Sequence, residues 1–277
     1  MLHTDAGHHV KQVIASFIFF EWISGYLSPY VAQFLPAYNA LSTEKKGEFH
    51  SRTCSTAHAV IVSVLCVYIV VADEEAKKDM VEGDSWLARS CLAVAIGYLL
   101  MDLRYCIRNI NKDLGSFLHH ISAIYPYSLV ILLGVLSYYA NFRLMAEIST
   151  PFVNIRWYYD VTGRKNSQIY FYNGLFLAGT FFLFRIAVMP VYYYLVYAAV
   201  GTEAYDRLGL ALQLSWIIPC IVLDVLNFLW FYKIMRGARK VMKKRKSKSG
   251  LNGHCLSTIT EESNEQKQTI NDSLKQD

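Results

Sequence analysis

The side chains best suited to chemistry in this sequence are histidines and carboxylates that interrupt long apolar runs. The sharpest feature is the neighbouring pair His119 and His120. An imidazole, which titrates near neutral pH, can abstract a proton from an amine or a hydroxyl. Neighbouring residues of a helix point about 100° apart, so the two rings cannot chelate one metal ion as an i,i+4 pair can. We therefore expect one ring to act as a catalytic base oriented by Asp102 or Glu147, and the other to bond a neighbouring helix.

A second set of polar groups lies within the same apolar runs: His58, Arg143, Asn154, Asn173 and Asp224. At a rise of about 1.5 Å per residue, most of these groups fall in one half of a bilayer, together with the candidate catalytic residues. An ion within hydrocarbon costs several kcal/mol unless it is paired or hydrated, so a cluster at one depth predicts a shared lipid chamber. The alternative is that these groups only hold the helices together. Three arginines, Arg89, Arg143 and Arg185, are expected toward the opposite half.

The elements that must position these groups are membrane-spanning helices. The chain is 54% hydrophobic with a mean hydropathy of +0.24, which is typical of an all-α, polytopic membrane helix bundle. About 20 apolar residues cross a bilayer, and this length predicts about seven spans. They cover residues 10–30, 53–72, 87–107, 117–139, 140–156, 169–200 and 208–232. The run 169–200 is longer than one crossing and contains Pro190, so we expect a kink there.

The segment 140–156 decides the topology because Arg143, Glu147, Pro151 and Asn154 make it too polar to face lipid. If it crosses, the positive-inside rule places the N-terminus outside and the C-terminus in the cytosol. If it does not cross, the later loops change sides and the charge asymmetry weakens. A polar helix that crosses needs shielding by its neighbours and should line an interior cavity.

The placement of charges and cysteines argues against several other classes of protein. Most of the net charge of +5 lies in the tail, and the aromatic residues lie in uncharged runs, which argues against nucleic-acid binding. Six cysteines without a CxxC pair indicate neither a zinc site nor a disulfide framework, so we expect no metal and no cofactor. Residues 1–39 are predicted to hold a retained transmembrane helix, and residues 242–277 a basic, then polar, disordered cytosolic tail. Its basic run either binds anionic lipid headgroups or sets the topology.

A resemblance to a known family adds to this interpretation. The residues that carry it are Leu41, Ser42, Lys45, Lys46, Ser51, Arg52, His58, Gly97, Tyr98, Asp102, His119, His120, Asn141, Phe142, Arg143, Glu147, Pro151, Phe152, Asn154, Arg156, Trp157, Gly201, Thr202, Glu203 and Asp224. Their order resembles the TLC domain, here covering residues 40–241. The resemblance implies an endoplasmic-reticulum bundle with six helices forming a barrel around a lipid-accessible chamber. In ceramide synthases of this family, paired histidines correspond to His119 and His120. The block after that pair carries a His-Asp and a further Asp there, whereas the sequence from Glu147 to Phe152 lacks them.

Three functions remain open from the sequence. The first is lipid homeostasis, in which the chamber binds or redistributes membrane lipids. The second is an acyltransferase that uses acyl-CoA, with His119 or His120 as the base. The third is a trafficking receptor or membrane chaperone that acts through its loops and tail.

Overall fold

A computed structural model describes the backbone of residues 6–273 and the side chains of residues 6–243. Residues 1–5 and 274–277, the side chains of the basic run beyond Lys243, and Cys255 lie outside the described part. In chain order the elements are α1 (Ala6–Trp22), the π-helical segment η1 (Ile23–Leu27), α2 (Ser28–Ala32), α3 (Pro36–Asn39), α4 (Thr43–Ala72), α5 (Glu74–Lys78), α6 (Trp86–Arg108), α7 (Leu114–Leu133), α8 (Ser137–Leu144), the 3₁₀ segment η2 (Met145–Ser149), α9 (Thr150–Val161), α10 (Gln168–Phe181), the π-helical segment η3 (Phe182–Ala187), α11 (Val188–Ala199) and α12 (Glu203–Ser273).

The all-α prediction is confirmed for the residues described. Within them, five helical stretches are long and apolar enough to cross a membrane: Thr43–Ala72, Trp86–Arg108, Leu114–Leu133, Gln168–Ala199 and Glu203–Lys243. The predicted first span corresponds to α1, η1 and α2, and the polar segment 140–156 to α8, η2 and α9. Neither is among the five, so the seven-span count and the barrel remain proposals.

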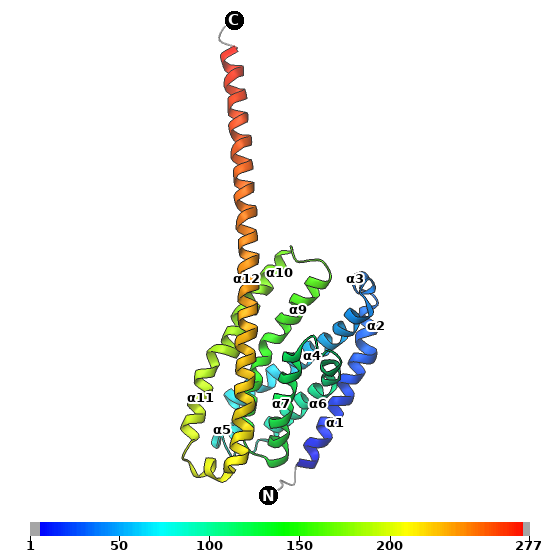
Figure 1. Cartoon of the computed structure of the whole chain (residues 1–277), viewed down its shortest axis with the longest axis vertical. Helices are drawn as coiled ribbons and strands as arrows, with labels where there is room; N and C mark the ends of the chain where they lie inside the picture. The colour runs from blue at the N-terminus through cyan, green and yellow to red at the C-terminus, as the bar shows by residue number, and fades with distance from the viewer. Residues whose placement is uncertain (1–5, 274–277) are drawn as a thin grey trace. The chain divides into compact units, whose positions relative to one another are not determined.

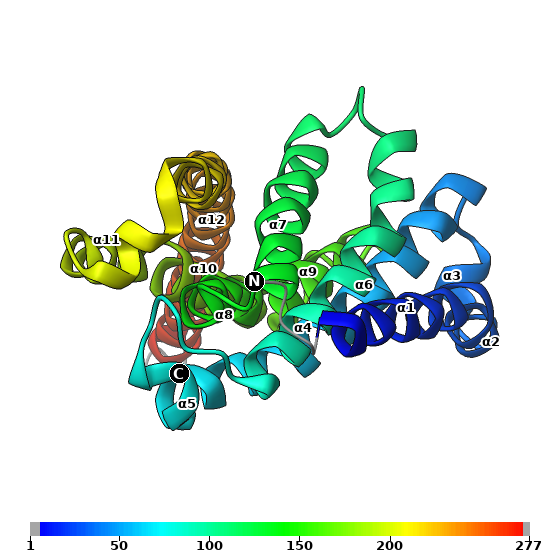
Figure 2. The same ribbon diagram turned by 90° about the horizontal axis from the view of Figure 1, so that it is seen from below.

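Helix α6 is the centre of the first unit, which ends at Phe231. It packs against α1 on one side and α7 on the other, and also against α4 and α8 (Figure 2). Close packing with α1 depends on Gly97, because a Cβ there would overlap the side chain of Ser16. The Ser16 hydroxyl in turn donates to the carbonyl of Val94 at 2.8 Å. Small residues allow such close approach between membrane helices.

A sharp reversal separates α7 from α8 and shortens the predicted span 117–139. Gly134 adopts the left-handed conformation, with φ of 70°, and ends α7 after Leu133. Leu136 also has a positive φ of 64°, and its N–H donates to the carbonyl of Val81 at 2.6 Å. The chain therefore turns back into the bundle and brings α8, η2 and α9 beside α4.

Both π-helical segments precede a proline. η1 lies just before Pro29, and η3 lies just before Pro190, so the irregularity expected in the run 169–200 occurs one turn ahead of the proline. Proline has no N–H and its ring crowds the preceding turn, which favours a widened turn upstream.

Residues 232–277 form a second unit. Its backbone continues α12 to Ser273 as helix, whereas the composition predicts disorder. The unit contains no proline and is rich in lysine, arginine, glutamate and glutamine, which are good helix formers. Extending an existing helix is also easier than nucleating one, so local propensity favours continuation.

Candidate functional site

The two histidines of α7 diverge. Asp113 caps the start of α7, since its side chain accepts from the N–H of Ser116 at 3.1 Å, and this cap places both histidines in the second turn. The centroids of the rings of His119 and His120 lie 5.7 Å apart with an angle of 79° between the planes. One ring therefore faces η2 and η3 while the other faces α6.

The ring of His119 lines a polar cavity. About 420 Å³ of empty space, including its opening, lies between Leu99, His119, Ala123, Tyr127, Arg143, Leu144, Ala146, Glu147, Arg185, Leu223 and Asn227. The Nε2 atom of His119 is 4.0 Å from Oε1 of Glu147. Its Nδ1 atom is buried and has no hydrogen-bond partner among the residues described. Buried polar atoms are rarely left unpaired, so this nitrogen lacks the hydrogen bond that a folded protein usually provides.

Glu147 and Arg185 form the charged wall of this polar cavity. The Nη2 atom of Arg185 is 3.8 Å from Oε1 of Glu147, and Oε2 accepts from the hydroxyl of Thr150 at 2.8 Å. Arg185 also donates to the carbonyl of Ala146 at 3.0 Å and to Oδ1 of Asn227 at 3.1 Å. Because every guanidinium nitrogen is bonded, the charge of Arg185 is held rigidly beside the carboxylate.

Arg143 and Asp224 form a second buried ion pair. The Nη2 atom of Arg143 is 2.5 Å from Oδ1 of Asp224, whose Oδ2 accepts from the hydroxyl of Tyr193 at 2.6 Å. Arg143 and Arg185, which the sequence analysis expects toward the opposite half of the bilayer, each lie within 4 Å of a carboxylate of the predicted set.

An apolar cavity adjoins the polar one. It contains about 500 Å³ of empty space, including its opening, lined by Ser122, Pro126, Tyr127, Leu129, Val130, Val135, Leu136, Tyr139, Ala140, Arg143, Tyr192, Leu212, Ser215, Trp216, Cys220 and Leu223. Tyr127, Arg143 and Leu223 line both cavities. The pair thus presents a hydrocarbon-lined space that ends at a group of charges.

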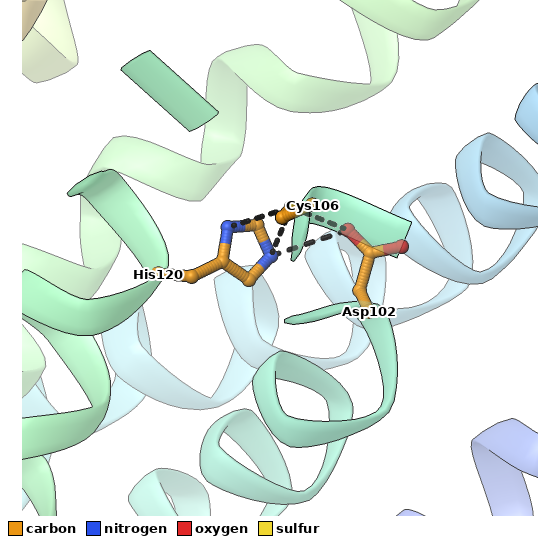
Figure 3. Close-up of side chains that lie close together, drawn as sticks. All are labelled: Asp102, Cys106 and His120. Atoms are coloured by element: carbon orange, nitrogen blue, oxygen red, sulfur yellow. Dashed lines mark hydrogen bonds and ion pairs between the residues drawn. The ribbon is translucent and has the colours of Figure 1, made fainter. Parts of the chain in front are cut away.

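On the other face of α7, His120 meets Asp102 and Cys106 of α6 (Figure 3). The Nε2 atom of His120 is 3.2 Å from Oδ2 of Asp102. All three side chains are buried, and none of them lines the two cavities described above.

The remaining predicted residues lie outside these cavities. His58 is buried, and its ring stacks on Tyr98 with centroids 4.1 Å apart. Asn154 donates to the hydroxyls of Ser55 and Thr56 and so ties α9 to α4. Asn173 donates to the carbonyl of Phe152 at 2.9 Å and ties α10 to α9. The predicted set is therefore divided: Arg143 lines both cavities, Asp224 holds it, and the two asparagines join helices.

Three residues of these sites escaped the sequence interpretation: Tyr127, Asn227 and Cys106. Two of them carried a usable signal. Cys106 follows Asp102 by four residues, and Asn227 follows Asp224 by three, so each pair shares a helix face. Tyr127 carried no comparable local pattern.

Comparison with known proteins gives consistent matches. A family model described as TLC domain matches residues 48–236. TLC domain-containing protein 4-A of Xenopus laevis is 43% identical over 235 residues, which cover 83% of this chain and 91% of that protein. TLC domain-containing protein 4 of Homo sapiens is 40% identical over 240 residues, 84% of this chain and 90% of that protein. Topoisomerase I damage affected protein 4 of Saccharomyces cerevisiae is 25% identical over 252 residues, 85% of this chain and 86% of that protein. No solved structure matches the chain.

Proposed function

Because the chain belongs to the TLC domain family, we propose that it is a multi-pass endoplasmic-reticulum protein of lipid homeostasis that binds membrane lipids in the paired cavities. The family is membrane-associated and linked to lipid metabolism. The proposal includes seven spans, with α8, η2 and α9 crossing inside the bundle, and a cytosolic C-terminus.

The observation that carries the proposal is the junction of the two cavities at Tyr127, Arg143 and Leu223. Sites for small molecules usually enclose about 300–1,000 Å³, with mainly apolar walls and a few polar groups. The apolar cavity suits a hydrocarbon chain, and the polar cavity suits the group that joins the chain to its headgroup.

The charges facing the polar cavity indicate what that polar group is. Arg143 pairs with Asp224, and Arg185 lies beside Glu147, so the two arginines and two carboxylates balance formally. An anionic phosphate would have to displace one of these carboxylates. The unpartnered Nδ1 atom of His119 offers a hydrogen bond instead. We therefore expect a lipid whose buried polar group is a hydroxyl or an amide.

Photo-crosslinking tests this proposal. The full chain in lipid nanodiscs would be exposed to a photoactivatable hydroxyl- and amide-bearing lipid and to a photoactivatable phosphatidic acid. We expect preferential capture of the first probe, with crosslinked peptides from α7 and from residues 203–231 of α12. The variant Leu212→Trp fills the apolar cavity and should reduce capture, whereas Leu214→Trp, at a residue 46% exposed on the same helix, should not. Equal capture by both variants would remove the proposed binding site.

One observation favours the acyltransferase as a second candidate. His119 and Glu147 face a cavity as an imidazole and a carboxylate 4.0 Å apart, an arrangement that suits a general base and its orienting group. Purified protein given acyl-CoA and amine or alcohol acceptors should then release free CoA and acylated product. His119→Gln should abolish turnover, and His9→Gln, at a buried histidine of α1, should not. Equal turnover in the wild type and His119→Gln would exclude this role.

A further inference from the structure

Two helices that line the apolar cavity each carry a proline in their interior. Pro126 lies within α7 and Pro219 within α12, and neither residue ends its helix. Proline has no N–H, so the carbonyl four residues before it loses its partner within the helix. The two carbonyls concerned belong to Ser122 and Ser215. Both serines line the apolar cavity, so each freed carbonyl belongs to a residue of its wall.

The freed carbonyl of Ser122 lies on the cavity side of α7. Residues four apart lie on one face of a helix, and a helical carbonyl points along the axis toward the residue four positions later. Ser122 and Pro126 both line the cavity, so the carbonyl between them lies on that face. On α12, Ser215 and Trp216 line the same cavity and Pro219 is buried. The carbonyl of Ser215 therefore faces the interior of the bundle.

Among the residues described, the hydroxyls near these carbonyls donate their protons elsewhere. Tyr125 of α7 and Ser215 of α12 join the two helices through hydroxyl oxygens that are 2.8 Å apart. The hydroxyl of Ser215 donates to the carbonyl of Ala211 at 2.8 Å, so the proton between the two hydroxyls comes from Tyr125. Within the described part of the chain, no side chain donates to the carbonyl of Ser122 or of Ser215.

Pro29 and Pro190 contrast with this pair of prolines. The carbonyls four residues before them, those of Gly25 and Ile186, lie in the π-helical segments η1 and η3. A π turn bonds a carbonyl to the N–H five residues later, and so passes over the N–H that proline lacks. The two serine carbonyls have no such alternative, because α7 and α12 remain α-helical at their prolines.

A free carbonyl inside a membrane protein needs a donor from another source. An unsatisfied backbone group is costly in hydrocarbon, where no bulk water replaces the lost bond. The cavity wall is mostly apolar, and its arginine, Arg143, is paired with Asp224. The hydroxyl of Ser122 also has no partner among the residues described, so it can donate to an oxygen of a ligand. A single atom that donates to a carbonyl and accepts from a serine is a hydroxyl oxygen, whereas an ammonium group cannot accept.

We propose that the apolar cavity binds a hydroxyl carried on the hydrocarbon chain of the lipid, which donates to the freed carbonyl of Ser122 or Ser215. This inference rests on the proposed lipid function and adds a second ligand group to it. His119, which lines the polar cavity, precedes Ser122 by one turn of α7. The hydroxyl therefore lies a few carbon atoms from the buried polar group of the lipid, and the cavity selects a hydroxylated chain over a plain one.

Competition between two photoactivatable amide lipids tests the inference. The probes have the same polar group and chain length, and only one carries a hydroxyl on the chain, a few carbon atoms from the amide. With the full chain in lipid nanodiscs, we expect about five- to tenfold more capture of the hydroxylated probe. Pro126→Ala combined with Pro219→Ala returns an N–H to each carbonyl and should bring this ratio to about one. Because alanine favours a helix interior over proline, unfolding does not account for such a loss.

Matched variants separate the freed carbonyls from general effects of substitution. Pro29→Ala combined with Pro190→Ala changes two prolines outside both cavities and should keep the wild-type ratio. Ser122→Ala removes the hydroxyl that donates to the ligand and should lower the ratio. Ser128→Ala changes a serine of the same helix whose hydroxyl has a backbone carbonyl as its partner, and it should not lower the ratio.

Two results would overturn the inference. One is equal capture of the two probes by the wild type, which would mean that water completes the carbonyls. The other is an undiminished ratio in the variant that lacks both Pro126 and Pro219. In either case, if Leu212→Trp still reduces capture of both probes, the proposed function stands without this selectivity. Absence of capture of either probe would overturn the lipid function and this site together.

Discussion

His119 and His120 are consecutive residues whose surroundings differ in kind. His119 faces a cavity, keeps one ring nitrogen unpartnered and lies 4.0 Å from its nearest carboxylate. His120 has a partner for each ring nitrogen and lies 3.2 Å from Asp102, in a contact that joins two helices. The cavity side suits a ligand that comes and goes, whereas the other side suits a fixed interaction. A dipeptide motif can therefore supply two unrelated sites.

The two sides also differ in how they hold charge. On the cavity side, Glu147 is neutralised by Arg185, a long side chain bonded at every nitrogen. On the side of His120, the carboxylate of Asp102 is held by the short side chain of Ser51. Loss of the arginine removes a charge, whereas loss of the serine removes only a hydrogen bond.

The largest effect is expected for Arg185→Leu. This change leaves Glu147 ionised and uncompensated within the bundle and should lower the free energy of unfolding by about 3–5 kcal/mol. Equilibrium unfolding in SDS mixed micelles measures it. The control Arg207→Leu removes an exposed arginine and should cost far less. Equal losses in the two variants would show that the cavity side does not depend on this charge.

Double-mutant cycles compare the two histidines directly. The cycle of His120→Gln with Asp102→Asn should give a coupling free energy of about 1–3 kcal/mol, because the atoms are 3.2 Å apart and buried. The cycle of His119→Gln with Glu147→Gln should give less than about 0.5 kcal/mol, because the atoms are 4.0 Å apart. The same unfolding assay measures both. A larger coupling for His119 would reverse the proposed division between ligand-facing and fixed histidines.

The smallest effect is expected at an exposed ion pair that serves as a reference for the buried ones. Arg207 donates to both carboxylate oxygens of Glu82, at 2.8 and 2.7 Å, and these hydrogen bonds lower the pKa of Glu82 from its ordinary value of 4.5. A lowered folded-state pKa gives stability that is present above the unfolded-state value and lost as the pH falls through the folded-state value. Glu82→Gln should therefore cost about 0.2–1 kcal/mol near neutral pH.

A pH series of unfolding measurements tests this dependence. The difference between wild type and Glu82→Gln should shrink below pH 4.5 and then vanish. Glu203→Gln is the matched control, since Glu203 is 93% exposed and lies 3.4 Å from Arg207. A difference that grows as the pH falls would contradict the assigned sign.

Hydropathy alone locates most of the membrane helices, because apolar length is a property of the sequence. The run 87–107 corresponds closely to α6, and the run 53–72 lies within α4. The predicted span 117–139 is too long because its end is set by backbone conformation at Gly134 and Leu136, which composition does not reveal. From the sequence alone, an isolated glycine in an apolar run is as compatible with the interior of a helix as with its end.

The candidate site could be predicted only where local geometry decides it. The divergence of His119 and His120 follows from the angle between neighbouring helical residues. The approach of Cys106 to His120 depends instead on how α6 packs on α7, which one sequence does not determine. The same holds for Asn154 and Asn173, whose depth is compatible with a chamber but whose partners lie on neighbouring helices.

The π-helical segment η3 has a consequence for how this family changes over time. A π turn holds one residue more than an α turn, so it accommodates a one-residue insertion without rotating the helix on either side of it. Arg185 lies within this segment and Pro190 just after it. A relative with a single-residue deletion between 182 and 187 would therefore keep the apolar helix and the orientation of its flanking turns, and the change would be confined to the position of Arg185 beside the polar cavity.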